Sequence, residues 1–452
     1  MIEELLSKQA NIKIFGKTKL FTIDELKNIL TPLDIHLTDD LDKADWIVEG
    51  NAISMHDENI LESVDKKIVF LKVFEQKLSS LIVPSSLLMS IKLSNNQERL
   101  KSFLMNPYIT DELFLSLFKL HNWKKEDLFG NNENRDVSAA FIERFYEDIE
   151  RNHLTQLSPL GFLHLINKTS RAEVIEAIYS IDSVNAQVDD DNPKNPILNI
   201  QIALGLNPHT PEKILEKLLQ NGKMDVKSAV ASNTNLSISL QKIASKKEPQ
   251  IRLALASNSG LSEELLFELL NDENMQIIET LLNTFIFDSE NFKKTLTLLD
   301  AQRLCFIANN NSLTTKMLHT LFILNNESIE LAIANNINLS SDDLNSLLVK
   351  ENINLLSNLA TAQRLEDTQV QKLLLLKNDE INSSLAKNIH LNKKIYEELY
   401  SLNKSTVSEF LAKNISTPLE ILEQFQLDAI LNRYVKENPT FTDAISQNIG
   451  WA

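Results

Sequence analysis

The chain has 452 residues, of which 43% are hydrophobic and 24% charged, as is typical of soluble globular proteins. Its 62 Asp and Glu residues outnumber its 45 Lys and Arg residues and give a net charge of −17. This balance disfavours nucleic-acid binding, because basic side chains that neutralise phosphates supply most of the affinity in that class. The single cysteine, Cys305, excludes an internal disulfide framework, and its apolar neighbours predict a buried thiol in a reducing compartment.

The N-terminal segment MIEELLSKQA lacks the basic start and the apolar run of a secretory signal. No stretch of the sequence approaches the roughly 20 apolar residues that a membrane span needs. We therefore expect a soluble, cytoplasmic protein without a membrane span.

Residues 10–82 predict a small α/β domain. The segment NIKIFG alternates as a strand, and Thr22 opens an amphipathic helix in TIDELKNIL. Two strands follow in DIHLT and ADWIVEG, then a helix in ENILESVDK, and last a strand that runs into a helix in KKIVFLKVFEQKLSSL. The predicted order is β-α-β-β-α-β-α.

This order, together with ADWIVEG and IVFLKVFEQKL, resembles a BRCT domain. The Gly-Gly pair usual after the first helix of that family is replaced by residues 32–34 (PLD), and Phe74 stands nearest to the usual Trp of the last helix. Phosphopeptide-binding members carry Ser or Thr before a Gly after the first strand, whereas Phe15 precedes Gly16 here. The resemblance thus implies the fold and does not extend to phosphopeptide recognition.

Residues 83–200 predict an irregular helical region with degenerate repeats. The segments FIERFYEDIERNHL, PLGFLHLINK and RAEVIEAIYSI each predict an amphipathic helix. The segment MNPYITDELFLSLF reads as a degenerate copy of the repeat that follows, with Asn106 at its turn. Residues 189–195 (DDDNPKN) predict a polar loop, since the alternation and the Gly of an EF-hand Ca²⁺ loop are absent.

From residue 201 to residue 452 the sequence is repetitive. Segments such as AVASNTNLS, ALASNSGLS, AIANNINLS and FLAKNISTP each place an Asn in one column. At spacings of 25 to 27 residues, the column contains Asn207, Asn233, Asn258, Asn283, Asn310, Asn336, Ala362, Asn388 and Asn414.

The positions around this column predict a helix that ends at the Asn. Large aliphatic residues three and seven positions before it, such as Leu255 and Ile251, share one helix face. Ala two positions before it, as at Ala256, allows neighbouring helices to approach closely. We interpret the Asn as the helix terminator, because it tolerates a left-handed backbone and bonds nearby backbone groups. The alternative interpretation is a ladder of asparagines that contacts a ligand.

A second helix in each unit begins at a capping residue, because such side chains accept from the first free amides of a helix. Pro211 and Pro418 suit the first helical position. Ser340 with Asp343 resembles a capping box. The helices are about two turns long and unstable alone, so the pairs must stack into a solenoid. The predicted caps are Thr210, Ser237, Ser262, Thr314, Ser340, Asn392 and Thr417.

The pattern resembles the leucine-rich repeat variant family, an α-solenoid related to HEAT repeats, best in EPQIRLALASNSGLSEELLFELL with its Arg252. The resemblance covers roughly residues 201–448. Some members carry an iron–sulfur module in a Cys-rich N-terminal segment, and this chain has no Cys there. The expected fold is mainly α: a solenoid of paired-helix repeats over residues 201–452, preceded by the α/β domain.

We predict no catalytic, cofactor-binding or metal-binding residues and no cofactor. The closest two glycines, Gly205 and Gly222, are 17 residues apart, which excludes dinucleotide fingerprints, P-loops and nucleophile elbows. The eight histidines form no HExxH motif. Lys17, Thr18 and Lys66 are candidates for a small anion site, although such residues are more commonly solvated surface.

The leading hypothesis is a non-enzymatic protein–protein interaction scaffold or adaptor that uses the solenoid surface. The acidic balance favours a basic protein partner over nucleic acid. The alternative is a DNA-associated, repair-type protein with a HEAT-like cradle, but residues 201–452 hold 23 Lys and Arg against 30 Asp and Glu. An enzyme resembling the HEAT-like DNA glycosylases is the least favoured hypothesis, and the oligomeric state stays open.

Overall fold

A computed structural model describes residues 2–6, 9–123, 132–146, 159–188, 192 and 194–449. The three carboxylates predicted in a loop at residues 189–191 and the second half of the helix predicted at residues 141–154 lie outside the described residues. The chain divides into two compact units, Met1–Leu236 and Ser237–Ala452, and each is described by itself.

The N-terminal unit begins with a four-stranded parallel sheet of order β2-β1-β3-β4. Ile12, Ile47 and Val48 on its central strands are fully buried. The helices between the strands provide the crossovers that parallel neighbours require. The predicted order of strands and helices is confirmed, with one further short helix, α1 (Ile2–Leu6), in front. The remaining elements are β1 (Ala10–Phe15), α2 (Ile23–Leu30), β2 (Ile35–Leu37), β3 (Trp46–Glu49), α3 (Met55–Ser63), β4 (Lys67–Phe70) and α4 (Leu71–Leu78).

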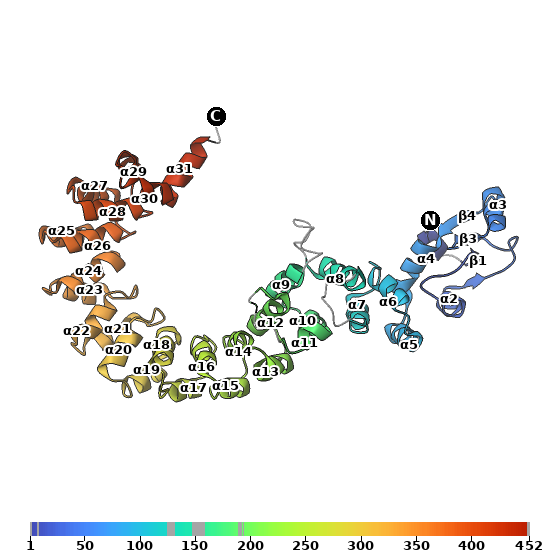
Figure 1. The fold of residues 1–452 in the computed structure, drawn as a ribbon, viewed down its shortest axis with the longest axis horizontal. Coiled ribbons are helices and arrows are strands. Elements are labelled where there is room, and N and C mark those ends of the chain that lie inside the picture. The colour runs from blue at the N-terminus through green and yellow to red at the C-terminus, as the bar shows by residue number, and fades with distance from the viewer. Residues whose placement is uncertain are drawn as a thin grey trace. The chain divides into compact units, whose positions relative to one another are not determined.

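The rest of the N-terminal unit is helical (Figure 1). Its first part is held by aromatic packing, with the rings of Phe118 and Phe141 4.3 Å apart. Further along, helices α9, α12 and α14 pack against one another in series. The helices are α5 (Pro84–Ser94), α6 (Gln97–Leu104), α7 (Asp111–Phe118), α8 (Asn132–Phe145), α9 (Pro159–Lys168), α10 (Ala172–Tyr179), α11 (Asp182–Asn185), α12 (Pro196–Leu206), α13 (Glu212–Asn221) and α14 (Met224–Ala231).

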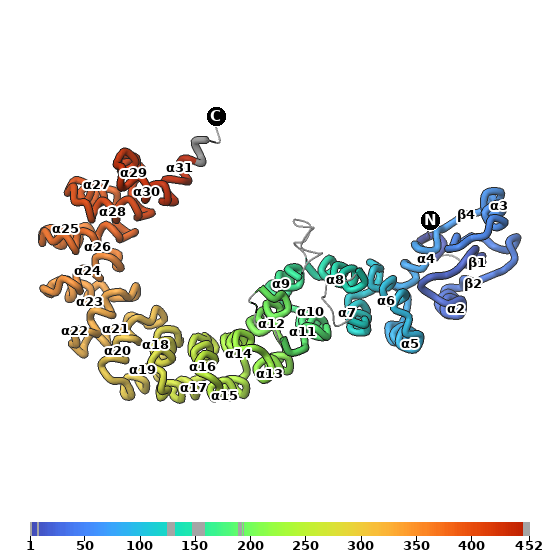
Figure 2. The backbone as a smooth tube through the Cα atoms, viewed as in Figure 1, coloured from blue at the N-terminus to red at the C-terminus, as the bar shows by residue number. Residues whose placement is uncertain are grey.

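The C-terminal unit is a series of stacked short helices, as predicted (Figures 1 and 2). Even-numbered helices pack against one another from α16 to α30, and most odd-numbered helices pack against the even-numbered helix that follows. The helices are α15 (Ile238–Ala244), α16 (Pro249–Ala256), α17 (Glu263–Leu269), α18 (Met275–Thr284), α19 (Ser289–Leu296), α20 (Ala301–Ala308), α21 (Thr315–Phe322), α22 (Glu327–Ile333), α23 (Ser341–Leu348), α24 (Ile353–Ala362), α25 (Asp367–Leu375), α26 (Asp379–Lys387), α27 (Lys393–Ser401), α28 (Ser405–Lys413), α29 (Leu419–Gln426), α30 (Asn432–Glu437) and α31 (Pro439–Ile449).

The small-residue column lies where neighbouring helices approach most closely. Ala308, Ala334 and Ala412 are all completely buried. In the N-terminal unit the same position is Gly205, where an added methyl would lie 3.1 Å from the Cβ of Ala229 on the next helix of the series. A larger side chain here would separate the helices, so the predicted role of this column is confirmed.

The conserved geometry of the Asn column is a hydrogen-bonded connection between repeats, which we call the amide ladder. Each such contact between two repeats is called a rung. In the rung of Asn336, the side-chain amide donates to the carbonyl oxygens of Ala308 and Asn310 in the preceding repeat, at 3.0 and 2.9 Å. Its side-chain oxygen accepts from the Asn338 amide at 3.0 Å, which shapes the turn that follows. The rungs of the C-terminal unit with this geometry are Asn310, Asn336, Gln363, Asn388, Asn414 and Asn438.

The amide ladder also occurs in the N-terminal unit. Asn233 donates to the carbonyl oxygens of Gly205 and Asn207 at 2.8 and 2.9 Å. Asn106 donates to Gln76 at 3.3 Å and accepts from the Tyr108 amide at 3.0 Å, as its predicted register implies. All rung residues are nearly inaccessible to solvent, so the interpretation as a ligand-contacting ladder is wrong.

Two predicted members of the column are misplaced. Helices α18 and α24 each have 10 residues and are longer than their even-numbered neighbours, so the rung falls later. Gln363 therefore serves instead of Ala362. Asn283 stays inside α18, and Phe285 supplies the carbonyl that accepts from Asn310. The Thr284 hydroxyl, 2.9 Å from the oxygen of Ala256, provides the bond to the preceding repeat.

Four of the seven predicted caps accept a hydrogen bond from a helix amide: Ser237, Thr314, Ser340 and Asn392.

Two predicted caps are wrong, and a third lies at its predicted position without the predicted bond. The hydroxyls of Thr210 and Thr417 donate to carbonyl oxygens at the end of the preceding helix, each at 2.6 Å, and Pro211 and Pro418 occupy the N-cap position rather than the first helical one. Ser262 is at the N-cap without a side-chain bond. Thr210 and Thr417 lie three residues after the Asn, one position earlier than the caps that form, so their hydroxyls reach the preceding helix.

The capping box predicted at Ser340 is half formed. The Ser340 hydroxyl accepts from the Asp343 amide at 3.0 Å. The Asp343 carboxylate instead pairs with the His319 ring at 2.9 Å.

We expect Asn336→Ala to loosen the joint between α20 and α22. The change leaves two carbonyls and one amide without a partner, at a cost of about 2–3 kcal/mol. Hydrogen–deuterium exchange should show faster exchange in α20 and α22. The neighbouring Asn335 is exposed, so Asn335→Ala is the matched control and should change exchange little. Equal effects of the two substitutions would contradict a structural role for the rung.

Candidate functional site

The described residues contain no group of three or more His, Cys, Asp or Glu side chains placed to hold a metal ion. None of the described helices combines the length and the apolar character of a membrane-spanning segment. Cys305 is half-buried rather than buried as predicted, because α20 is only partly covered over residues 303–306. Burial raises the pKa of its thiol.

The predicted anion site is not formed. Lys17 and Thr18 follow β1 at the carboxyl edge of the parallel sheet, whereas Lys66 precedes β4 at the opposite edge. The Lys66 ammonium is bound to backbone carbonyl oxygens, including that of Ala44 at 2.6 Å. Parallel strands begin and end at opposite edges, so these three residues do not converge.

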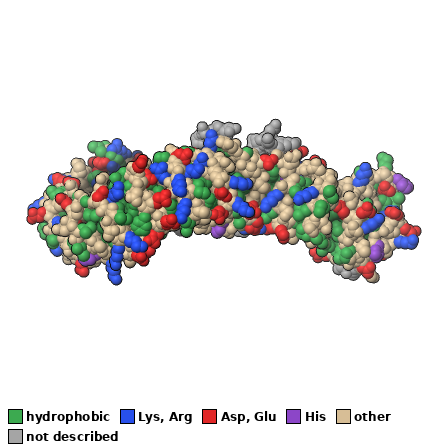
Figure 3. Space-filling model, turned by 90° about the horizontal axis from the view of Figure 1, so that it is seen from below, with side chains coloured by type: hydrophobic (Ala, Val, Ile, Leu, Met, Phe, Trp, Pro, Cys, Tyr) green, Lys and Arg blue, Asp and Glu red, His purple; other side chains and the backbone are tan. Residues whose placement is uncertain are grey.

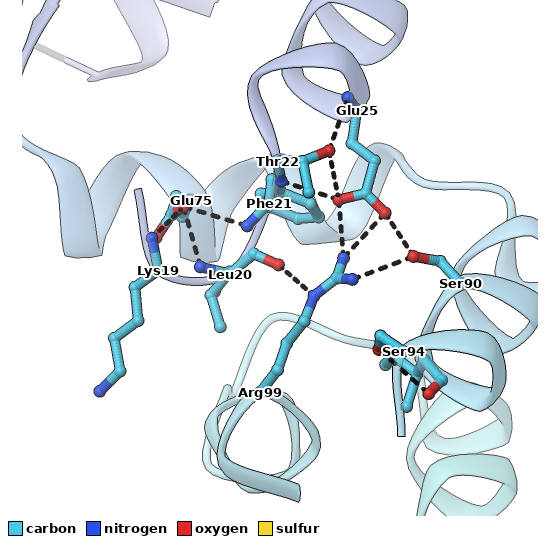
Figure 4. Close-up of polar contacts among 10 residues, drawn as sticks. Lys19, Leu20, Phe21, Thr22, Glu25, Glu75, Ser90, Ser94 and Arg99 are labelled. Atoms are coloured by element: carbon cyan, nitrogen blue, oxygen red, sulfur yellow. Dashed lines mark hydrogen bonds and ion pairs between the residues drawn. The ribbon is translucent and has the colours of Figure 1, made fainter. Parts of the chain in front are cut away.

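The most concentrated polar network lies where the α/β domain meets α6 (Figure 4). Glu75 on α4 is 1% exposed, and one of its carboxylate oxygens accepts from three consecutive amides. These belong to Lys19, Leu20 and Phe21, at 3.0, 2.9 and 3.2 Å. The carboxylate thus fixes the loop between β1 and α2 from one side, because it satisfies amides that would otherwise be buried without a partner.

Arg99 on α6 fixes the same loop from the other side. Its Nε donates to the Leu20 carbonyl at 2.6 Å, and its guanidinium binds both oxygens of Glu25 at 2.8 and 2.9 Å. The Glu25 carboxylate also accepts from Ser90 and from the Thr22 amide. Because Arg99 is itself nearly buried, this bidentate pair joins α6 firmly to the sheet domain.

The two carboxylates of this network have opposite pKa shifts. Burial raises the pKa of Glu75 above its usual value, and the three amide bonds offset this only in part. Burial also acts to raise the pKa of Glu25, but hydrogen bonds from Ser90, the Thr22 amide and Arg99 outweigh it and hold that pKa below its usual value.

A cavity of about 460 Å³ lies beside Glu75. Lys19 and Lys72 are exposed at its rim, and Lys101 in its wall pairs with Asp136 at 2.7 Å. The lining contains acidic and basic side chains and is open to solvent. It offers polar groups to a small molecule, but these groups do not form a ready-made binding site.

Two repeats carry the same ion pair with reversed polarity. Arg252 lies six residues before its rung residue and binds Asp272, fourteen residues after it, at 2.7 Å. In a later repeat these two positions are Glu330 and Lys350, 2.5 Å apart. Burial acts to raise the pKa of Asp272, but the Arg252 hydrogen bond outweighs this and lowers it. Each pair connects an even-numbered helix to the loop that follows the next odd-numbered helix. The loop position can be occupied by a residue of either charge.

A row of exposed aliphatic side chains follows the ends of odd-numbered helices in the C-terminal unit. Each member lies thirteen residues after a rung position. The row begins at Leu298, since the same position is Lys246 and Asn271 in the two repeats before it, and it is interrupted at Ser401. We call it the apolar edge: Leu298, Ile323, Val349, Leu376 and Leu427, which are 58, 64, 77, 54 and 82% exposed.

The charged side chains on the surface are interspersed. Figure 3 shows one face of the molecule, on which Lys and Arg lie among Asp and Glu. This face therefore lacks the field of one sign that a nucleic-acid cradle uses.

No protein-family model matches the chain, and no curated protein matches it in sequence. The architecture therefore defines the class: a helical-repeat solenoid that follows a small parallel α/β domain.

We expect the Glu330–Lys350 pair to tolerate inversion. Glu330→Arg or Lys350→Asp alone places like charges together and should cost about 1–2 kcal/mol, since the lysine is partly solvated. The double variant Glu330→Arg/Lys350→Asp places its charges in the same order as Arg252 and Asp272. It should recover most of the lost stability. A double-mutant cycle on urea unfolding measures the coupling. Additive losses would show that the two side chains do not interact.

We also expect Glu75→Gln to stabilise the folded protein, relative to the native chain, by an amount that increases as pH rises. Gln keeps an oxygen for the three amides but carries no charge to bury. The stability of the native carboxyl is fully present below its unfolded pKa, near 4.5, and is lost as pH rises through the raised folded pKa. Unfolding midpoints should therefore diverge in favour of the variant as pH rises above about 4.5, until the native carboxyl is fully ionised.

Glu98→Gln is the control for this experiment, because Glu98 lines the same cavity and is exposed. Its effect on stability should stay within about 0.5 kcal/mol. A Glu75→Gln effect of constant size across the pH range would contradict the assignment.

Proposed function

We propose that this chain is a non-enzymatic scaffold or adaptor that binds a protein partner along its apolar edge. The observation that carries the proposal is the exposure of Leu298, Ile323, Val349, Leu376 and Leu427 at one position of the repeat. Isolated exposed aliphatic residues are ordinary, but an aligned row is typical of interaction sites.

The regular joints support this role. Amide-ladder bonds such as those of Asn336 and Asn388 hold successive repeats at fixed separation, so the row is presented without being ordered on binding. The stacked short helices support membership of the leucine-rich repeat variant and HEAT-like class. The four-stranded parallel sheet, with strands and helices in the chain order that the sequence predicts, supports a BRCT-like N-terminal domain.

The partner we propose is basic and the compartment cytoplasmic. The net charge of −17 favours association with a positively charged protein. The single cysteine suits a reducing compartment.

The test places a photo-crosslinking amino acid at Val349. We expect one discrete protein adduct in cell extract, and we expect Leu376→Ser to reduce it about tenfold, because burial of one such side chain contributes about 1.5 kcal/mol or more. The unfolding midpoint should be unchanged, since Leu376 is exposed.

The matched control places the crosslinker at Ile337, which is 69% exposed and directly follows the Asn336 rung. No discrete adduct is expected from this position. The same adducts from both positions, or none from Val349, would contradict the proposed edge. An adduct with a second copy of the chain would show that the apolar edge mediates self-assembly and does not bind another protein.

A further inference from the structure

Cations and aromatic rings alternate across three successive even-numbered helices near the C-terminal end of the array. The Lys387 ammonium of α26 lies 4.1 Å from the ring centroid of Phe410 on α28. The Lys413 ammonium of α28 lies 4.1 Å from the ring centroid of Tyr434 on α30. The guanidinium of Arg433 lies 4.3 Å from the same ring. We call these five residues the cation–aromatic row.

The row occupies a free face of the helices. Phe410 packs partly against the core beside Val407, whereas Lys413 projects toward solvent from the other side of α28. The rings are partly buried, whereas Lys387 and Lys413 are exposed. Each ring therefore supports the stem of a cation whose charged end faces solvent.

The charge of the row is only partly neutralised. Glu409 binds Lys413 at 2.6 Å. Lys387 and Arg433 form no ion pair with a carboxylate in the described part of the chain. The charge of Arg433 also acts on Glu409, so Lys387 is the cation of the row that is most open to an external anion, in a chain whose overall charge is negative.

We propose that the cation–aromatic row binds an extended acidic peptide segment. Lys387 and Lys413 occupy equivalent positions of adjacent repeats, each directly before a rung residue. Packed helices lie about 8–10 Å apart. An extended peptide advances about 3.3 Å per residue, so carboxylates at every third residue match the spacing of the repeat.

A peptide fits this row better than single-stranded nucleic acid does. Base recognition on such surfaces depends on open aromatic faces, and cations already cover the rings of Phe410 and Tyr434. A long polyanion would also be repelled by the net charge of −17, whereas a peptide with a few carboxylates meets only the local cations.

The test uses the full chain and a fluorescent peptide of about twelve extended residues with Glu at every third position. Fluorescence anisotropy at low salt should detect binding that the Gln counterpart lacks. The double variant Lys387→Gln/Arg433→Gln should weaken binding about tenfold, and Phe410→Leu should weaken it with every charge retained.

The matched control is Lys393→Gln/Lys404→Gln, which removes two exposed lysines paired with carboxylates elsewhere on the array. It should change affinity less than about twofold. Equal weakening by both double variants, or equal binding of the Gln peptide, would overturn the proposal. Displacement by single-stranded oligothymidylate at lower concentration than by unlabelled peptide would overturn it in favour of nucleic acid.

This inference does not depend on the apolar edge. The variant Val349→Ser should bind the acidic peptide with unchanged affinity, and its loss of binding would overturn the separation of the two surfaces. If the peptide does not bind but the crosslink at Val349 still forms, only the inference about the cation–aromatic row is contradicted. The proposed function of the apolar edge then stands.

Discussion

At the end of most even-numbered helices of the C-terminal unit, a side-chain amide reaches back to two carbonyl oxygens of the repeat before it. This contact does more than terminate a helix, because it satisfies carbonyls that the end of the preceding helix leaves unpaired. The small residue two positions earlier brings the helices close enough for the contact, as at Ala334 beside Asn336. Spacing, burial and the direction of the next helix all depend on it.

Much of this architecture follows from the sequence, because the repeat imposes one pattern many times. The buried aliphatic column, the small column and the order of strands and helices along the α/β domain are confirmed. The acceptor of each Asn was not predictable, since it lies in another repeat. The rung at Gln363 was missed because packing lengthens α24, and a one-residue shift in the column has no local signal.

The ion-pair columns show a further limit of sequence reasoning. Arg252 and Glu330 occupy equivalent positions with opposite charge, so neither column has a residue type to recognise. The same holds for Glu75, an unremarkable residue of an amphipathic helix until the fold brings three amides to it. The apolar edge is likewise found only once the register of the rungs is known, because its members share one position of the repeat.

One joint of the array differs from the others. At Phe285 the side chain has no amide, and a single bond from the Thr284 hydroxyl to Ala256 replaces the usual pair. The ring instead packs with Phe287 at 5.1 Å, and such apolar contacts have little directional preference. Bending compliance within the C-terminal unit should therefore concentrate between α16 and α18, and the repeats from α18 onward should move as one stiffer segment.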